Sequence, residues 1–387
     1  NDPEVVSKIV ASQAHHKKID GHAPGLQGKD LDTYVAAGVY SDHECATMED
    51  ALAKLQRGQF IMIREGTAAR NLEALAPLLT PQYAERCMFC TDDKHPSDLL
   101  EKGHIDYIAR EAINKYGVDP IIAVKAACHH ASRYFLLNNR GAIAPGYLAD
   151  FAVIDNFKDF NVEMVFKKGV LYWNNGELRD FEAPKIEEYL DKRAHDTFHV
   201  STLTPDDFRD TRQRGVLGMV PGEIITTDNG YADHVDLEKD ILKIAVVERH
   251  KGTHHIGLGY IQGYGLKSGA VATSISHDSH NIIVVGTNSA DMAFAANYIV
   301  EHHGGIVVVE NGTVKGSVVL EIAGIMSDRP LTEVNDQLEA AKDAAFTLGV
   351  SRGIDPFMTL SFMALPVIPK LRITTRGVVD VDTQQYV

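Results

Sequence analysis

The feature that most constrains the fold is a series of short apolar segments near the start of the chain that alternate with amphipathic segments. Strands that alternate with helices of this length predict βα units and a parallel sheet, and therefore an α/β fold. The predicted strands lie at residues 18–22, 39–43, 60–66 and 86–93. The predicted helices lie at residues 31–37, 48–56, 72–79, 105–115 and 119–135.

The way these four predicted strands end is as informative as their spacing. Each is followed by polar side chains: His22, then His43 with Glu44, then Arg64 with Glu65, then Asp92 with Asp93. In a (β/α)8 barrel the active site lies at the carboxyl ends of the strands, so these side chains would converge on one pocket.

These residue types suit a hydrolytic metal site. His22 and His43 could each bind an ion, and a carboxylate at Asp92 could both bind metal and accept a proton from an attacking water. Each side chain could instead cap a helix or a turn. Their repetition at equivalent positions favours function.

The rest of the chain changes character. Residues 141–180 predict a small antiparallel sheet, residues 181–210 a charged linker or surface segment, and residues from 215 onward a second region of strands and helices. We therefore expect three domains, at residues 1–140, 141–195 and 196–387.

Two further motifs follow in the last region. His277-Asp278-Ser279-His280 comes after a predicted strand and could bind metal, contact a substrate or cap a turn. The glycine-rich stretch at residues 257–265 lacks the spacing of a phosphate-binding motif and predicts a flexible loop near a ligand.

Cys87 and Cys90 lack the second pair that a zinc site needs, and we expect buried free thiols.

Composition excludes several classes of protein. The 387 residues include 38 basic and 53 acidic side chains, and the net charge of −15 disfavours nucleic acid as a partner. No apolar run approaches the roughly 18 residues of a membrane span. Few cysteines and a polar start to the chain predict a cytoplasmic protein.

Five stretches of this sequence resemble the adenine deaminases of the amidohydrolase superfamily. The first three, Asp20–Leu26, Ser41–Glu44 and Cys90–Asp93, indicate the superfamily. Ser276–Asn281 indicates the adenine-specific branch, and the Pro145–Asp150 turn is typical of the small β domain.

The resemblance implies a (β/α)8 barrel with an inserted β-sandwich and a C-terminal α+β domain. It implies two metal ions, manganese or iron with zinc as an alternative, and hydrolysis of adenine to hypoxanthine and ammonia in purine salvage. By resemblance, the site residues have four roles: His22 and His43 as metal ligands, Asp92 as ligand and proton shuttle, Arg64, Glu65 and Asp93 as pocket lining, and His277, Asp278 and His280 as substrate contacts.

One departure from the family pattern is large. The family has a His-x-His pair after barrel strand one and a carboxylate after strand four, but this chain contains no His-x-His. We therefore expect only the second half of the barrel here, inactive without a missing N-terminal segment, within a homo-oligomeric assembly. Two alternatives stay open: an amidohydrolase acting on another cyclic amide or amidine, and a non-catalytic binding or assembly module.

Overall fold

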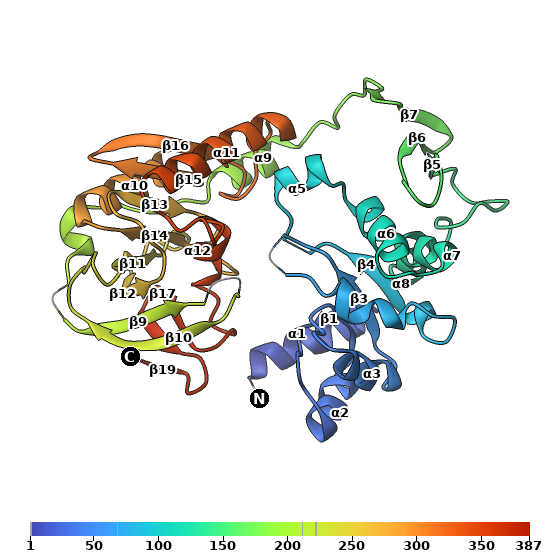
Figure 1. Ribbon diagram of the computed structural model, residues 1–387, viewed down its shortest axis with the longest axis horizontal. Helices are drawn as coiled ribbons and strands as arrows, with labels where there is room; N and C mark the ends of the chain where they lie inside the picture. Colours follow the sequence, from blue (N-terminus) through green and yellow to red (C-terminus); the bar gives the residue numbers. More distant parts are fainter. Residues whose placement is uncertain (1, 68, 211, 221–222) are drawn as a thin grey trace. The chain divides into compact units, whose positions relative to one another are not determined.

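The computed structural model describes residues 2–67, 69–210, 212–220 and 223–387 (Figure 1). The chain forms two compact units, residues 1–183 and 184–387. Strands and helices alternate in the first unit and a large sheet dominates the second, which confirms the α/β class. The boundaries of the three expected domains stay a prediction.

The first unit is built on a four-stranded parallel sheet whose strands follow one another in chain order. All four strands occur where the sequence predicts them, because each apolar segment is bounded by polar turns. They are β1 (Ile19–Gly21), β2 (Val39–Asp42), β3 (Phe60–Arg64) and β4 (Cys87–Cys90).

Helices connect and cover these strands. Helix α3 shows why these segments form helices. Thr47 accepts a hydrogen bond from the Asp50 amide and so caps the start of the helix. Glu49 and Asp50 lie in the first turn, where negative charge interacts favourably with the positive end of the helix dipole. The helices are α1 (Pro3–Ala14), α2 (Gly28–Ala36), α3 (Met48–Gln56), α4 (Leu72–Leu75), α5 (Pro96–Glu101), α6 (Ile105–Asn114), α7 (Pro120–Val124) and α8 (His130–Tyr134), with a π-helical turn at Lys125–His129 and 3-10 turns at Ala76–Leu78 and Ala84–Arg86.

The core of this unit lies between the sheet and the helices. Ile61 and Ile63 of β3 pack with Leu72 and Leu75 of α4 and with Ile108 of α6, all almost completely buried. Burying apolar surface stabilises the fold by roughly 25 cal/mol per Å², and this packing holds the strand ends in register. A small antiparallel sheet follows, as predicted, with β5 (Phe151–Ile154), β6 (Val162–Lys167), β7 (Val170–Asn174) and β8 (Glu177–Leu178).

The second unit is built on an eight-stranded sheet in the order β10-β9-β12-β11-β14-β13-β15-β16. Successive side chains of β11 point to opposite faces, so Leu242, Ile244 and Val246 join one core while Ala245 and Val247 join another. The strands are β9 (Arg214–Met219), β10 (Thr226–Ala232), β11 (Ile241–Val247), β12 (Ile256–Gln262), β13 (Ala270–Thr273), β14 (Ile282–Gly286), β15 (Gly305–Glu310) and β16 (Thr313–Val319).

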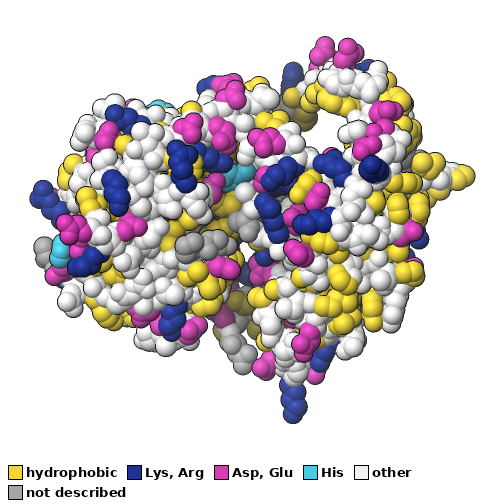
Figure 2. Space-filling view, viewed as in Figure 1, with side chains coloured by type: hydrophobic (Ala, Val, Ile, Leu, Met, Phe, Trp, Pro, Cys, Tyr) yellow, Lys and Arg dark blue, Asp and Glu magenta, His cyan; other side chains and the backbone are white. Residues whose placement is uncertain are grey.

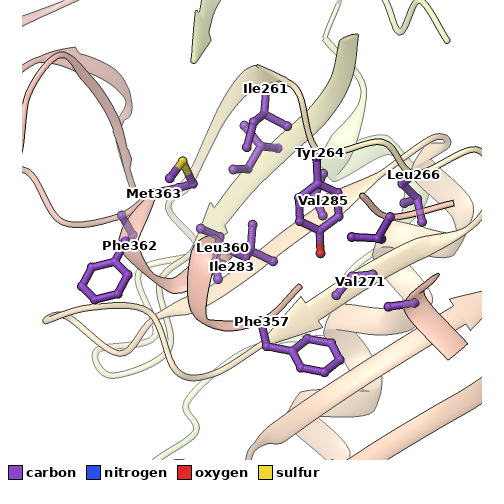
Figure 3. Packing of buried hydrophobic residues seen from close by; sticks show 14 of the residues in the cluster. Ile261, Tyr264, Leu266, Val271, Ile283, Val285, Phe357, Leu360, Phe362 and Met363 are labelled. Carbon is purple, nitrogen blue, oxygen red and sulfur yellow. The ribbon is translucent and has the colours of Figure 1, made fainter. Parts of the chain in front are cut away.

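A helical layer covers each face of this sheet. Helix α10 (Ser289–Glu301) contributes Met292 and Ile299 to one core, and α11 (Leu331–Thr347) contributes Leu338 to the other. Figure 3 shows Leu360 of α12 (Met358–Phe362) near Ile283 in the second of these cores. A three-stranded sheet, β17 (Leu371–Thr374), β18 (Gly377–Asp380) and β19 (Gln385–Tyr386), completes the unit.

One expectation for the second unit is wrong. Residues 257–265 do not form a flexible loop, because most of them belong to the buried strand β12. A Cβ on Gly257 would lie 1.9 Å from the carbonyl oxygen of Thr374, so this glycine permits close packing of a neighbouring strand. The charged segment at 181–210 is largely exposed, as expected of a linker or surface segment, and it contains helix α9 (Glu188–His195) and a 3-10 turn at Pro205–Phe208.

Surface and thiol chemistry agree with the sequence where they are described. Acidic and basic side chains are interspersed on the face drawn in Figure 2. Cys87 is buried, Cys90 is largely buried, and both are free thiols. None of the helices in the described part of the chain is long and apolar enough to cross a membrane.

Candidate metal centre

The carboxyl ends of β1 and β2 bring three metal-binding side chains together. His22, His43 and Glu44 each offer a ligand atom, and these atoms all lie within 4.8 Å of one another. The imidazole centroids of His22 and His43 are 4.4 Å apart. This proximity follows from the pairing of β1 with β2 in parallel, which places the two strand ends side by side.

A chain of hydrogen bonds fixes the His43 imidazole. Its Nδ1 lies 2.9 Å from Asp20 Oδ2, and the Ser41 hydroxyl donates to Asp20 Oδ1 at 2.7 Å. The Tyr134 hydroxyl lies 2.6 Å from the same Ser41 oxygen. Burial opposes ionisation of Asp20, but the hydrogen bonds from His43 and Ser41 outweigh it and lower the pKa of this carboxyl. With Nδ1 engaged by a carboxylate, the other ring nitrogen is left for a metal ion.

His22 and Glu44 form the second interaction of the centre. His22 Nδ1 lies 3.5 Å from Glu44 Oε1. Glu44 raises the pKa of His22, and the contact with His22 lowers the pKa of Glu44 to about 2 against the effect of burial. Glu44 is therefore ionised at neutral pH. Sequence reasoning did not select Glu44 as a ligand, although its position directly after His43 was a usable signal.

Arg64 connects this group to Asp92. Its Nη1 lies 2.6 Å from Asp92 Oδ2 and 3.3 Å from Glu44 Oε1. The ends of β2, β3 and β4 therefore meet in one charged cluster. Asp92 lies outside the set of three ligand atoms and reaches them through the Arg64 guanidinium. Its backbone φ of 51° is in the left-handed region.

The two remaining strand-end acids, Glu65 and Asp93, directly follow Arg64 and Asp92 in the chain. Glu65 Oε1 is 3.8 Å from Arg70 Nε, and burial raises the pKa of the Glu65 carboxyl. The Asp93 carbonyl accepts a hydrogen bond from the Thr67 amide at 2.9 Å, which ties the loops after β3 and β4 together.

The remaining candidates lie in the second unit, in the loop after β13. The His277 amide donates to the Ser361 carbonyl at 3.1 Å, and the His277 imidazole stacks on Phe362 with centroids 5.2 Å apart. His277 also forms an ion pair with Asp278. Burial, followed by the charge of His277, lowers the pKa of His280. A role of His277, Asp278 and His280 in substrate binding stays a prediction.

The donor set fits a divalent transition metal. Two imidazoles and one ionised carboxylate are ligands that manganese, iron and zinc all accept. The residues that sequence reasoning missed here are Glu44, as a third donor, and Asp20, which orients His43.

Comparison with known sequences agrees with this description. The sequence model of the amidohydrolase family matches residues 1–172, and that of the adenine deaminase C-terminal domain matches residues 223–385. The match to the amidohydrolase family, together with a parallel βα sheet that carries imidazoles and carboxylates at its carboxyl edge, assigns the first unit to the amidohydrolases, a class that implies a divalent metal cofactor.

Two relatives identify the family within this class. The chain is 44% identical to the adenine deaminase of Desulfatibacillum aliphaticivorans over 394 residues, which is 100% of this chain and 68% of the relative. It is 43% identical to the adenine deaminase of Nitratidesulfovibrio vulgaris over 399 residues, again 100% of this chain and 68% of the relative. The chain belongs to the adenine deaminase family.

Proposed function

We propose that this chain takes part in the hydrolytic deamination of adenine to hypoxanthine and ammonia, in purine salvage. The observation that carries the proposal is the convergence of His22, His43 and Glu44 at one edge of the parallel sheet. The choice of adenine as substrate rests on the relatives named adenine deaminase, which align with the whole chain.

The three converging side chains would hold a divalent ion. Such an ion, manganese or iron with zinc as an alternative, lowers the pKa of a bound water towards neutrality and so supplies a nucleophile. Asp20 contacts the His43 ring directly and Tyr134 acts through Ser41, and together they hold the ring in one orientation.

Asp92 would carry the proton. Its carboxylate accepts a proton from the water that attacks C6 of adenine and delivers it to the amine that leaves as ammonia. The contact of Arg64 with both Asp92 and Glu44 positions this carboxylate beside the ligands. Glu65 and Asp93 would line the pocket, and His277, Asp278 and His280 would contact the purine.

A binuclear site needs more ligands than this cluster offers. The chain spans 68% of the length of the two relatives above and contains no His-x-His. We propose that the remaining ligands come from a segment outside these 387 residues, and that the chain is inactive without it.

The test is to express the chain alone and together with the part of the Desulfatibacillum relative that it does not cover. Both preparations receive manganese, and ammonia release is measured with adenine, guanine, cytosine and a cyclic amide. We expect deamination of adenine only, and only in the complemented preparation. Turnover of a different substrate would identify another amidohydrolase activity. No turnover by a complemented, manganese-loaded preparation would favour a binding module.

A further inference from the structure

We infer that Asp42 is a positioning residue that fixes both ligand-bearing loops of the metal centre through their backbones. The inference rests on the proposed metal site, because it assigns a role toward His22, His43 and Glu44. Asp42 contacts none of those side chains in the hydrogen bonds and ion pairs of the described residues.

The two oxygens of Asp42 accept hydrogen bonds from two different loops. Oδ2 accepts from the amide of Ala23, the residue after His22, at 2.8 Å. Oδ1 accepts from the amide of Glu44, the residue after His43, also at 2.8 Å. One carboxylate at the end of β2 thus connects the loop after β1 to the loop after β2.

Asp42 is held in place by a buried charge. Its side chain and that of Lys54 in α3 are both completely buried, and Lys54 Nζ lies 3.2 Å from Asp42 Oδ2. Removing one partner of such a pair leaves a buried charge uncompensated, which is strongly destabilising. The pair therefore ties the ligand loops to a helix that packs against the sheet.

The chemistry requires a carboxylate at this position. An asparagine of the same shape has one oxygen and one NH2 group, so in either orientation a donor would face one of the two backbone amides. The loop that loses its acceptor would then be free to move, and metal affinity would fall. Loss of such outer partners typically costs 10- to 100-fold in metal affinity.

The chain supplies a matched control in Asp50. Its Oδ2 lies 3.2 Å from the same Lys54 Nζ, and its side chain is almost as buried as that of Asp42. No hydrogen bond of the described residues joins the Asp50 side chain to either ligand loop. Asp50→Asn removes the same charge from Lys54 and leaves the loops alone, so it separates positioning from general stability.

The experiment compares the 387-residue chain with its Asp42→Asn and Asp50→Asn variants by two measurements. Amide hydrogen exchange is followed in peptides covering residues 19–26 and 41–46, and Mn²⁺ affinity is measured by titration with a competing chelator. We expect Asp42→Asn to accelerate exchange in both loops by about tenfold or more and to weaken Mn²⁺ binding about 10- to 100-fold. Asp50→Asn should leave both quantities close to wild type.

The outcomes separate this inference from the proposed function. Equal exchange rates in the two variants overturn the role of Asp42, whether or not Mn²⁺ binds. Failure of the wild-type chain to bind Mn²⁺ contradicts the metal site but leaves the exchange comparison to decide on Asp42. If Asp42→Asn does not fold, Asp42→Glu keeps the charge beside Lys54 while displacing both acceptor oxygens, and the same acceleration is expected.

Discussion

At the scale of single residues, the acids near the metal centre have different roles because they make different contacts. Glu44 is ionised by its contact with His22 and is one of the three candidate ligands. Asp20 holds the His43 imidazole in place, and Asp42 holds backbone amides in place. Asp92 is the most exposed of the four except for Asp20, at 36% against 40%, and is held by Arg64. Of these two acids, the exposed carboxylate that does not orient an imidazole ligand is the one suited to move a proton.

Replacing Asp92 with Asn should therefore abolish turnover and spare adenine binding. General acid–base catalysis contributes roughly 10²- to 10⁴-fold, so kcat of the complemented enzyme should fall by at least about 10²-fold. Steady-state kinetics and adenine binding by calorimetry check this. Asp159→Asn, in an exposed turn of the small sheet, is the control. Retained turnover in Asp92→Asn would rule out its role as proton shuttle.

Asp210 should make stability depend on pH. Burial opposes its ionisation, but hydrogen bonds from Arg212 and Arg214 outweigh this effect and hold the pKa well below its usual range. A depressed folded-state pKa stabilises the fold above the unfolded value of 3.8, and this contribution is lost as the pH falls below it. Asp210→Asn should thus cost about 1–3 kcal/mol at pH 7 and progressively less below pH ~4.

Urea unfolding at several pH values measures this difference. Asp206→Asn is the matched control, because its ion pair with Arg209 is mostly exposed and such pairs contribute about 0–1 kcal/mol. A cost for Asp210→Asn that is the same at pH 3 and pH 7 would contradict the assignment.

At the scale of elements, periodicity in the sequence predicted the four parallel strands of the first unit and most of its helices. Helix α3 begins and ends at the predicted residues, because a side-chain cap and acidic first turn mark its start. The side-by-side placement of His22 and His43 was also predictable, since parallel strands share a carboxyl edge. The role of Asp42 was not, because it depends on the hydrogen-bond directions of a buried carboxylate.

Strand β12 shows where sequence patterns mislead. Its glycines suggested mobility, but a Cβ on Gly259 would lie 2.4 Å from Val378 and one on Gly257 would meet backbone atoms between β17 and β18. Such glycines are required by contacts with residues more than 100 positions away, which no local pattern reveals.

Gly257→Ala should consequently destabilise the second unit. The added methyl group would force the Thr374 carbonyl and the Gly377 amide, 1.9 and 2.5 Å away, to move. Overpacking of this kind costs about 1–3 kcal/mol or more, measurable by thermal unfolding. Gly353→Ala, whose Cβ would meet only the Ser351 hydroxyl at 3.6 Å, should change stability by less than about 0.5 kcal/mol. Equal effects of the two substitutions would refute the packing argument.

At the scale of the whole molecule, the two units differ in how completely an apolar core covers their sheets. Each has its own apolar core: that of the second unit covers both faces of an eight-stranded sheet, and that of the first lies against four parallel strands. In the described residues both sheets have edge strands that pair on one side only, β1 and β4 in the parallel sheet and β10 and β16 in the eight-stranded sheet. Unpaired strand edges are templates for association with other chains.

This difference predicts opposite behaviour of the separated units. A fragment of residues 184–387 should remain monomeric and unfold cooperatively, because its core and its helical layers are internal to it. A fragment of residues 1–183 should aggregate at micromolar concentration, because its open edges β1 and β4 belong to a sheet of only four parallel strands whose one large core lies between the sheet and the helices. Light scattering and thermal unfolding of the two fragments measure this.

The segment of the relative that the chain does not cover should suppress aggregation of the first fragment only, since a barrel closes by pairing both edges. A soluble, monomeric first fragment would mean that its sheet edges need no partner, and would count against completion of the barrel by another segment.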